Sequence, residues 1–432
     1  MDGYYAFMLV ATALVLLMTV PALALFYGGM SRSKSVLNMM MMSYVAAAIV
    51  GILYVAVGWS MGFSGDGTFF ADPFDLFWLD GVSTDGYVFV MFQMTFAIIT
   101  VALISGAVAD RLKFSAWVVF APLWALLCYF PMAHMVFSCT EDSLICGRIG
   151  AQDYAGGTAV HINAGVAALV LVLLLGKRVG WPKDKMRPHN LTLTMLGAGL
   201  LWFGWYGFNV GSIVLGDDPE TQFPLETGRT FANTTLATMA AILAWLLVER
   251  LLHKKATSLG AASGIVAGLV AITPAAGAVD IGGAVAIGAV AGALCAWAVG
   301  WKFRLGYDDS LDVVGVHLVG GIVGTVLIGL FSTAEGAGGV DGLLYGGGLG
   351  SLGDQVLGAL VAIVFSAVVT TVIALALKYT VGLRIAEDAE VEGIDLAAHG
   401  ETAYDLHVGS LGGGKTGVLA ASTAPVSEGA QA

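Results

Sequence analysis

Two histidines inside long apolar segments are the residues best placed to do chemistry. His161 and His317 each follow a valine and precede, by four residues, a glycine, Gly165 or Gly321. Neutral imidazoles can hydrogen-bond each other, one ring donating and the other accepting, whereas two imidazolium ions are costly in an apolar medium. If the two segments are neighbours, the rings offer a polar contact without fixed charge. The alternative is two unrelated core histidines, each bonded to backbone carbonyls.

The segments that carry these histidines belong to a chain that consists mostly of predicted membrane-spanning segments. Of 432 residues, 58% are hydrophobic and 12% charged, against roughly 25% charged in soluble domains. Apolar stretches of about 20 residues, the length that crosses a bilayer, occur about eleven times, and the 59 glycines indicate tight helix packing. A β-barrel would show short alternating strands, so the predicted fold is an all-α polytopic membrane protein. The approximate spans are 4–27, 38–62, 88–109, 114–137, 156–176, 191–214, 230–248, 259–273, 281–300, 311–332 and 353–378.

Lysine and arginine are distributed unevenly among the predicted loops. If the N-terminus lies outside, 17 of the 19 lysines and arginines fall in cytoplasmic loops or the tail, and only Arg148 and Arg229 lie outside. The positive-inside rule therefore favours 11 transmembrane helices with the N-terminus out and the C-terminus in. The net charge of -12 comes largely from acidic outer loops and the tail. A nucleic acid partner is not expected.

The two histidine patterns also indicate an internal repeat. They lie on the fifth and the tenth predicted spans, about one half-length apart. Because five spans per half is an odd number, the halves would lie in the membrane with opposite orientations. We therefore predict two inverted five-helix repeats plus a final helix, with a site near the membrane midplane.

The chain divides by composition into three regions. Residues 1–380 form the predicted membrane domain, 381–410 a charged cytoplasmic regulatory tail, and 411–432 a disordered C-terminus rich in small residues. A small-residue sequence in the first span could be a signal-peptide cleavage site, but the acidic N-terminus and the continuing apolar run favour a retained helix. Cys139 and Cys146 share an outer loop, where an oxidising compartment would permit a disulfide that spacing alone does not decide.

Several motifs around the histidines form a consistent set. Two of them are DYAGGTAVHINAG, which ends at Gly165, and DVVGVHLVGG, which contains His317. Three others are WFGWYGFNVGS, which ends at Ser212, QMTF, which ends at Phe96, and HGETAY in the tail. In these motifs and in their order, the chain resembles the Amt family of ammonium transporters over about residues 4–406.

The resemblance implies a role for each matching residue. By it, His161 and His317 are the twin histidines of a pore, and Phe96 and Phe208 form the gate at its outer entrance. It also implicates Ser212 beside Gly211 at the substrate-recruitment site, and Asp153 as a support for ammonium binding that does not touch the ion. Independently of the resemblance, Asp153 is placed to cap the start of its helix. Gln93, Trp205 and Asn209 are expected to be packing or secondary contacts. The family usually has a tryptophan where Phe137 stands, so we expect a weaker outer cation site. Without the resemblance, the phenylalanines would be ordinary helix packing.

The function implied by the resemblance is transport of ammonium or ammonia across the cell membrane. Ammonium would be recruited at the outer aromatic site, deprotonated, and conducted as ammonia past the histidines. The resemblance also implies a homotrimer in the lipid bilayer and a P-II type nitrogen signalling protein at the cytoplasmic face. We expect no cofactor, no metal and no enzyme activity. The alternatives are an ammonium sensor or receptor of the same fold, and a related Rhesus-type channel.

Overall fold

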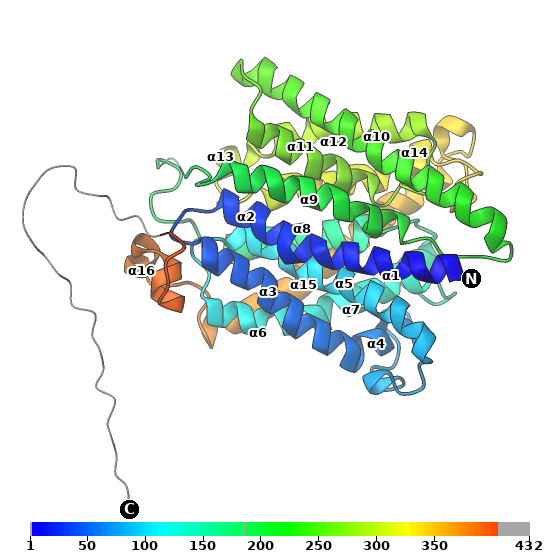
Figure 1. Cartoon of the computed structure of the whole chain (residues 1–432), viewed down its shortest axis with the longest axis horizontal. Coiled ribbons are helices and arrows are strands. Elements are labelled where there is room, and N and C mark those ends of the chain that lie inside the picture. Colours follow the sequence, from blue (N-terminus) through cyan, green and yellow to red (C-terminus); the bar gives the residue numbers. More distant parts are fainter. Residues whose placement is uncertain (1, 185, 405–432) are drawn as a thin grey trace, which may run out of the picture.

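The fold consists of helices, most of which run along the long axis of the molecule (Figure 1). A computed structural model describes residues 2–184 and 186–404. The helices of the first half are α1 (Asp2–Leu17), α2 (Ala24–Met30), α3 (Val36–Leu53), α4 (Trp59–Phe63), α5 (Tyr87–Ile104), α6 (Phe114–Trp124), α7 (Phe130–Ala133) and α8 (Asn163–Leu175). Those of the second half are α9 (Leu191–Val210), α10 (Pro219–His253), α11 (Ser258–Ile272), α12 (Ile281–Ala298), α13 (Trp301–Leu305), α14 (Val319–Phe331), α15 (Gly350–Tyr379) and α16 (Glu387–Glu392).

The apolar helices coincide with the predicted spans. Within the described residues, ten helical stretches are long and apolar enough to cross a membrane, and each overlaps one predicted span. The remaining predicted span, 259–273, is α11, an apolar and largely buried helix of 15 residues. An all-helical, multi-pass membrane architecture is therefore confirmed.

The longest helix, α10, differs from its predicted span of 230–248. It begins at Pro219, ends at His253 and is 35 residues long. Proline at the first helical position and the Asp218 carboxylate, which accepts from the Thr221 N–H, start the helix before the apolar run. The predicted start was wrong because the first turns are polar, and a scan for apolar stretches counts polar turns as loop.

Glycines make the closest helix contacts. A Cβ added at Gly288 of α12 would lie 2.1 Å from the carbonyl oxygen of Ala237 in α10. A Cβ added at Gly292, one turn further, would lie 2.3 Å from the carbonyl oxygen of Ala241. The backbones of α10 and α12 therefore touch, which small residues permit in membrane helices.

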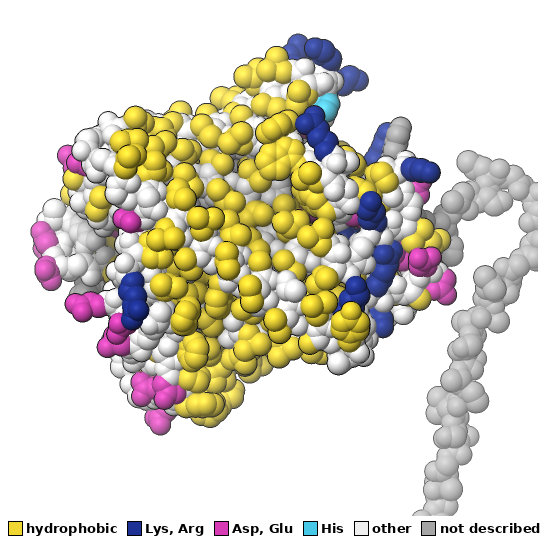
Figure 2. Space-filling view, turned by 180° about the vertical axis from the view of Figure 1, so that it is seen from behind, with side chains coloured by type: hydrophobic (Ala, Val, Ile, Leu, Met, Phe, Trp, Pro, Cys, Tyr) yellow, Lys and Arg dark blue, Asp and Glu magenta, His cyan; other side chains and the backbone are white. Residues whose placement is uncertain are grey.

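Charged side chains separate toward the two ends of the bundle (Figure 2). Lysines and arginines gather at the end that carries α13 and α16, which we call the basic end. The opposite end, where α1 begins, is rich in aspartate and glutamate, and we call it the acidic end. The surface between them is mainly hydrophobic. A hydrophobic band between two charged ends is typical of a bundle that spans a bilayer.

The tail packs against the basic end of the bundle. Asp395 accepts hydrogen bonds from two successive backbone N–H groups at the start of α3, at 3.1 and 2.8 Å, and so caps that helix. Glu390 is fully buried and pairs with Arg384 at 2.7 Å. Residues 381–404 are therefore docked on the membrane bundle. The stretch 411–432, predicted to be disordered, lies outside the described residues.

Candidate functional site

The two histidines from the repeated pattern are in contact inside the bundle. The Nδ1 atoms of His161 and His317 are 3.2 Å apart, and the ring centroids are 5.3 Å apart. Both side chains are buried, with 1% and 3% of their surface exposed. At this distance one imidazole donates its N–H and the other accepts, so two neutral rings fit and two imidazolium ions do not. The pair is a polar group without fixed charge.

Each histidine lies on a π-helical turn that leads into a spanning helix. His161 belongs to η9 (Gly157–Ile162), which precedes α8, and His317 belongs to η10 (Val314–Leu318), which precedes α14. In η9, two successive N–H groups, including that of His161, bond to the Gly156 carbonyl at 2.9 and 3.1 Å. Single π turns inside helices are frequent at functional sites, because the extra residue changes the direction of the side chains.

The glycine of each repeated pattern packs against the opposite histidine turn. A Cβ added at Gly165 would lie 2.5 Å from the backbone nitrogen of Leu318, the residue after the second histidine. A Cβ added at Gly321 would lie 3.0 Å from Ile162, the residue after the first histidine. The glycine in each half therefore allows the histidine turn of the other half to approach closely. This reciprocal contact gives a physical reason for the V-H-x-x-x-G spacing in both halves.

A pair of stacked phenylalanines lies next to the histidines. The rings of Phe96, on α5, and Phe208, on α9, are 4.0 Å apart at an angle of 15°. The Phe208 ring is 6.3 Å from that of His161. Both phenylalanines are buried, at 1% and 0% exposure. The structure thus brings Phe96, Phe208, His161 and His317 into one row.

A cavity of about 480 Å³ lies beside Phe96 at the acidic end, and we call it the vestibule. Phe137 meets Phe96 edge-on, with the ring centroids 6.4 Å apart. The Ser212 hydroxyl donates to the Phe208 carbonyl at 2.8 Å, so its oxygen can still accept a hydrogen bond. The vestibule is lined by Phe63, Gln93, Phe96, Val136, Phe137, Cys139, Cys146, Gln152, Asp153, Tyr154, Ser212, Val214, Gln222, Glu226, Pro274, Ala278, Ala337 and Gly338.

The three residues predicted as packing or secondary contacts take different places. Trp205 stacks on the first histidine, 5.5 Å between ring centroids, and its indole N–H donates to the Thr273 hydroxyl at 2.8 Å. Asn209 links α9 to α10 by donating to the Thr234 hydroxyl at 3.0 Å. Gln93 instead lines the vestibule. Trp205 and Asn209 therefore hold the site in shape, and Gln93 faces the space that a solute would occupy.

Asp153 caps the π turn that carries His161. Its two carboxylate oxygens accept hydrogen bonds from four successive backbone N–H groups, those of residues 156–159, at 2.7 to 3.2 Å. Burial raises the pKa of this carboxyl, and the four amides favour the charged form and oppose that shift. The negative charge is therefore matched by backbone dipoles, and the side chain fixes the start of the histidine turn.

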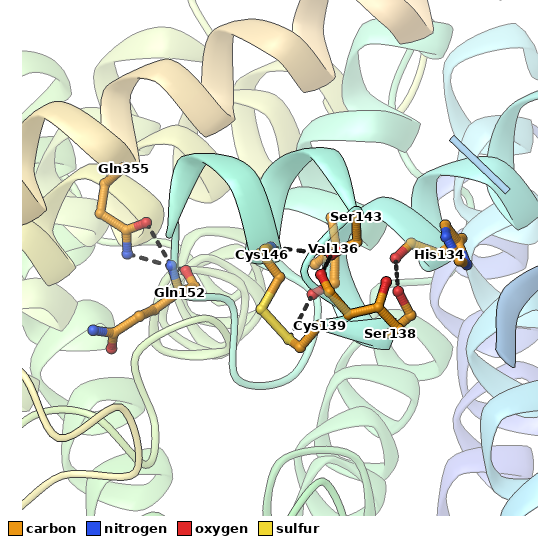
Figure 3. The surroundings of a disulfide bond; sticks show 10 residues. His134, Val136, Ser138, Cys139, Ser143, Cys146, Gln152 and Gln355 are labelled. Carbon is orange, nitrogen blue, oxygen red and sulfur yellow. Dashed lines mark hydrogen bonds between the residues drawn. A yellow bond between two sulfur atoms is a disulfide. The ribbon is translucent and has the colours of Figure 1, made fainter. Parts of the chain in front are cut away.

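One wall of the vestibule is braced by a disulfide (Figure 3). Cys139 and Cys146, whose pairing the spacing left open, are joined, and both line the cavity. Within the bridged loop, the Ser143 hydroxyl accepts from the Gly147 N–H at 3.0 Å. Beside it, the side chain of Gln355 on α15 bonds both the N–H and the C=O of Gln152, at 2.9 and 3.0 Å. The loop is therefore tied to itself and to α15.

Charged residues lie near the basic-end side of the row. A small cavity of about 10 Å³ borders His317 and Asp312. Asp312 pairs with Lys302 at 2.6 Å and does not cap the turn that carries His317. The cap is Asp309, whose carboxylate accepts from the Val314 N–H at 2.7 Å. Asp312 has a positive φ of 64°, which turns the chain between this aspartate and the helix.

Some residues of the site were not predicted from the sequence. Glu226, Gln222 and Tyr154 line the vestibule, and Thr273 holds the tryptophan that stacks on a histidine. Glu226 and Gln222 lie in the polar first turns of α10 that were counted as loop. Recognising Asp218 and Pro219 as a helix start would have placed both residues on the helix. In the part of the chain that the structure describes, no three His, Cys, Asp or Glu side chains converge as metal ligands.

The fold and the site define a class of protein. Membrane-spanning helices that surround a row of buried aromatic and imidazole rings, with a cavity at either end of the row, form a multi-pass membrane transport protein. The family model for the Ammonium Transporter Family matches residues 6–404. The chain belongs to the ammonium transporter family.

Relatives and solved structures agree with this assignment. An ammonium transporter of Mycobacterium tuberculosis is 54% identical, over 94% of this chain and 91% of its own length. An ammonium transporter of Aquifex aeolicus is 48% identical, over 94% of both chains. Among solved structures, Saccharomyces cerevisiae Mep2 superposes with a TM-score of 0.80 at 32% identity, covering 89% of this chain and 88% of that one. A structure described as a Sensor Amt Protein superposes with a TM-score of 0.83 at 27% identity, covering 92% and 98%.

Proposed function

We propose that this protein carries ammonium across the membrane by removing its proton and conducting ammonia past His161 and His317. Phe96, Phe137 and Ser212 recruit the cation in the vestibule, and the stack of Phe96 on Phe208 is the gate. The observation that carries the proposal is the contact of the two imidazoles, 3.2 Å apart and buried, directly behind the phenylalanine stack.

The outer part of the site suits a small cation. A cation over an aromatic face gains about 0.5 to 2 kcal/mol, and a hydroxyl oxygen can accept one of its protons. Phe137 and Phe96 supply faces and edges to the vestibule, and Ser212 supplies the acceptor. Ammonium can use both kinds of contact, whereas potassium and sodium have no proton to donate.

The inner part of the site selects against bare ions. Beyond Phe208 the row offers aromatic carbon and two neutral imidazoles, so a dehydrated potassium ion would lose its water with little in return. Ammonium can leave its proton behind and continue as neutral ammonia. His161 Nε2 is buried and bonds to no described residue, so it is available to hydrogen-bond the passing molecule.

The whole-molecule part of the proposal is an orientation and an assembly. We place the acidic end outside and the basic end, with the docked tail, in the cytoplasm, as the positive-inside rule requires. The proposed topology has eleven spans, arranged as two inverted halves plus a final helix. The proposed assembly is a trimer in the cell membrane, with a P-II type protein bound at the basic end. The repeated histidine turns and their reciprocal glycines support the inverted halves.

The proposal is tested by flux through the purified protein in proteoliposomes. An inward ammonium gradient is applied, and the rate of ammonia accumulation is compared with that of protein-free liposomes. We expect the protein to raise the rate several-fold and a matched potassium gradient to produce no flux. Saturable ammonium binding without flux would instead indicate a sensor of the same fold.

A further inference from the structure

The vestibule contains a carboxylate with no role so far. Among the eighteen residues that line the cavity, the carboxylates are Asp153 and Glu226, and none of the eighteen is lysine, arginine or histidine. The charge of Asp153 is matched by four backbone N–H groups. Glu226 has no such set of amides. The two carboxylates of one cavity therefore differ in how their charge is balanced.

The surroundings of Glu226 are polar but neutral. Its side chain is 8% exposed. The Tyr154 hydroxyl donates to one carboxylate oxygen at 2.8 Å, and the Gln222 amide donates to the other at 2.9 Å. Burial raises the pKa of Tyr154, so the phenol stays protonated and remains a donor. Arg229, the basic residue closest in sequence, pairs with Glu335 instead.

A carboxylate in this setting lacks a counterion. A largely buried negative charge with only neutral donors is costly, and a nearby positive charge offsets that cost. Within the described residues, no lysine, arginine or histidine forms a salt bridge with Glu226. The space next to it is the vestibule, which is large enough for a hydrated monovalent cation. Gln152 also lines the vestibule, and its Oε1 is a buried acceptor without a bond to any described residue.

We propose that Glu226 is the residue that draws the ammonium cation into the vestibule and sets its apparent affinity. Tyr154 and Gln222 position the carboxylate, and Gln152 adds a neutral oxygen acceptor elsewhere in the lining of the same cavity. Asp153, in contrast, caps the turn that carries His161. The cation is held first near Glu226 by charge and then passes to the aromatic rings of Phe96 and Phe137. This inference rests on the proposed transport function, and it assigns the electrostatic part of recruitment.

The test measures initial rates of ammonium flux against ammonium concentration in proteoliposomes of the full chain. Glu226→Gln keeps the shape and an oxygen for the Tyr154 hydroxyl but removes the charge. We expect the half-saturating concentration to rise about three- to tenfold, with the maximal rate within about twofold of wild type. We also expect added salt to weaken apparent affinity less in the variant, because screening acts on the missing charge. Glu220→Gln, on the same helix but exposed and outside the cavity lining, is the matched control.

A second variant separates charge from shape. Glu226→Asp keeps the charge with a shorter side chain, and we expect its half-saturating concentration and salt dependence to stay closer to wild type than those of Glu226→Gln. The inference is overturned if Glu226→Gln behaves like Glu220→Gln, or if the aspartate and glutamine variants are equally impaired with unchanged salt dependence. Absence of ammonium flux in the wild-type protein itself would overturn the proposed function, a result distinct from either of these.

Discussion

At the scale of single residues, the site depends on neutral polar groups in an apolar setting. The imidazoles of His161 and His317 share one hydrogen bond, the Ser212 hydroxyl keeps an acceptor free, and Trp205 is fixed by its indole N–H. None of these side chains carries a fixed charge. A solute can therefore be hydrogen-bonded along the row without meeting an ion that would trap or repel it.

The ring at position 137 is the simplest residue to test. Phe137 stands where the family usually has tryptophan, and tryptophan is the stronger partner for a cation. Substituting Phe137→Trp should lower the half-saturating ammonium concentration about two- to fivefold, the equivalent of roughly 0.5 to 1 kcal/mol. Flux in proteoliposomes measures it. Phe203→Trp, at a position on α9 that is 58% exposed, is the control. An unchanged or higher half-saturating concentration for Phe137→Trp would contradict this account of the outer site.

At the scale of elements, two π turns are held together by a glycine from each half. The turns η9 and η10 carry the histidines, and the close approach of backbone at Gly165 and Gly321 sets their separation. Asp153 caps one turn and Asp309 the other. The histidine contact is therefore a property of how the two halves meet, not of either helix alone.

A single methyl group at this meeting point should separate the histidines. In Gly165→Ala the new Cβ would lie 2.5 Å from the Leu318 nitrogen, which is backbone and cannot rotate away. We expect a loss of about 1 to 3 kcal/mol of unfolding free energy and a fall in ammonium flux of at least tenfold. Gly199→Ala, in α9, meets nothing within 4 Å and should leave both quantities near wild type. Thermal unfolding in detergent and liposome flux are the measurements. A Gly165→Ala protein with normal stability and flux would rule out the close contact.

The cap of the second turn should make stability depend on pH. Burial raises the pKa of Asp309 to about 6, with Asp312 adding to the shift and Lys302 opposing it. The folded state then binds this proton more tightly than the unfolded state, so the stabilisation is complete below pH about 4 and is lost as pH rises through about 6. Asp309→Asn removes this titration and keeps an oxygen for the Val314 N–H. Relative to wild type, it should gain thermal stability as pH is raised from 5 to 8. If the stability of the variant relative to wild type instead falls between pH 5 and pH 8, the carboxylate is favoured by its neighbours and the assignment is wrong.

The sequence predicted those elements whose cause is visible along the chain. The length of the apolar stretches identified the spans, and the repeated V-H-x-x-x-G pattern predicted that His161 and His317 meet, as they do in the structure. It did not predict the start of α10, because polar turns can belong to a helix outside the apolar run. It also did not identify Asp309 as the cap of the second histidine turn, because the positive φ at Asp312 is not encoded by residue type. Glu226 was not predicted as a site residue, because it lies in the polar first turns of α10 that were counted as loop.

At the scale of the whole molecule, charge and packing divide the bundle into two ends with different tasks. The acidic end holds the vestibule and its disulfide, and the basic end holds the docked tail. Since the docked tail caps α3 through Asp395, a protein bound at the basic end could act on a spanning helix without entering the row of rings. Transport by such a molecule requires that the row itself is the route.

The most direct test of that route is the current carried by reconstituted protein on a solid-supported membrane, with ammonium and potassium compared and His161 and His317 replaced singly by alanine. We predict that wild type gives a saturable response to ammonium and none to potassium. Each alanine variant should lose at least about tenfold of the ammonium response or lose the discrimination against potassium, because one imidazole cannot replace the pair. Both variants retaining wild-type current and selectivity would contradict the claim that nitrogen passes between these rings.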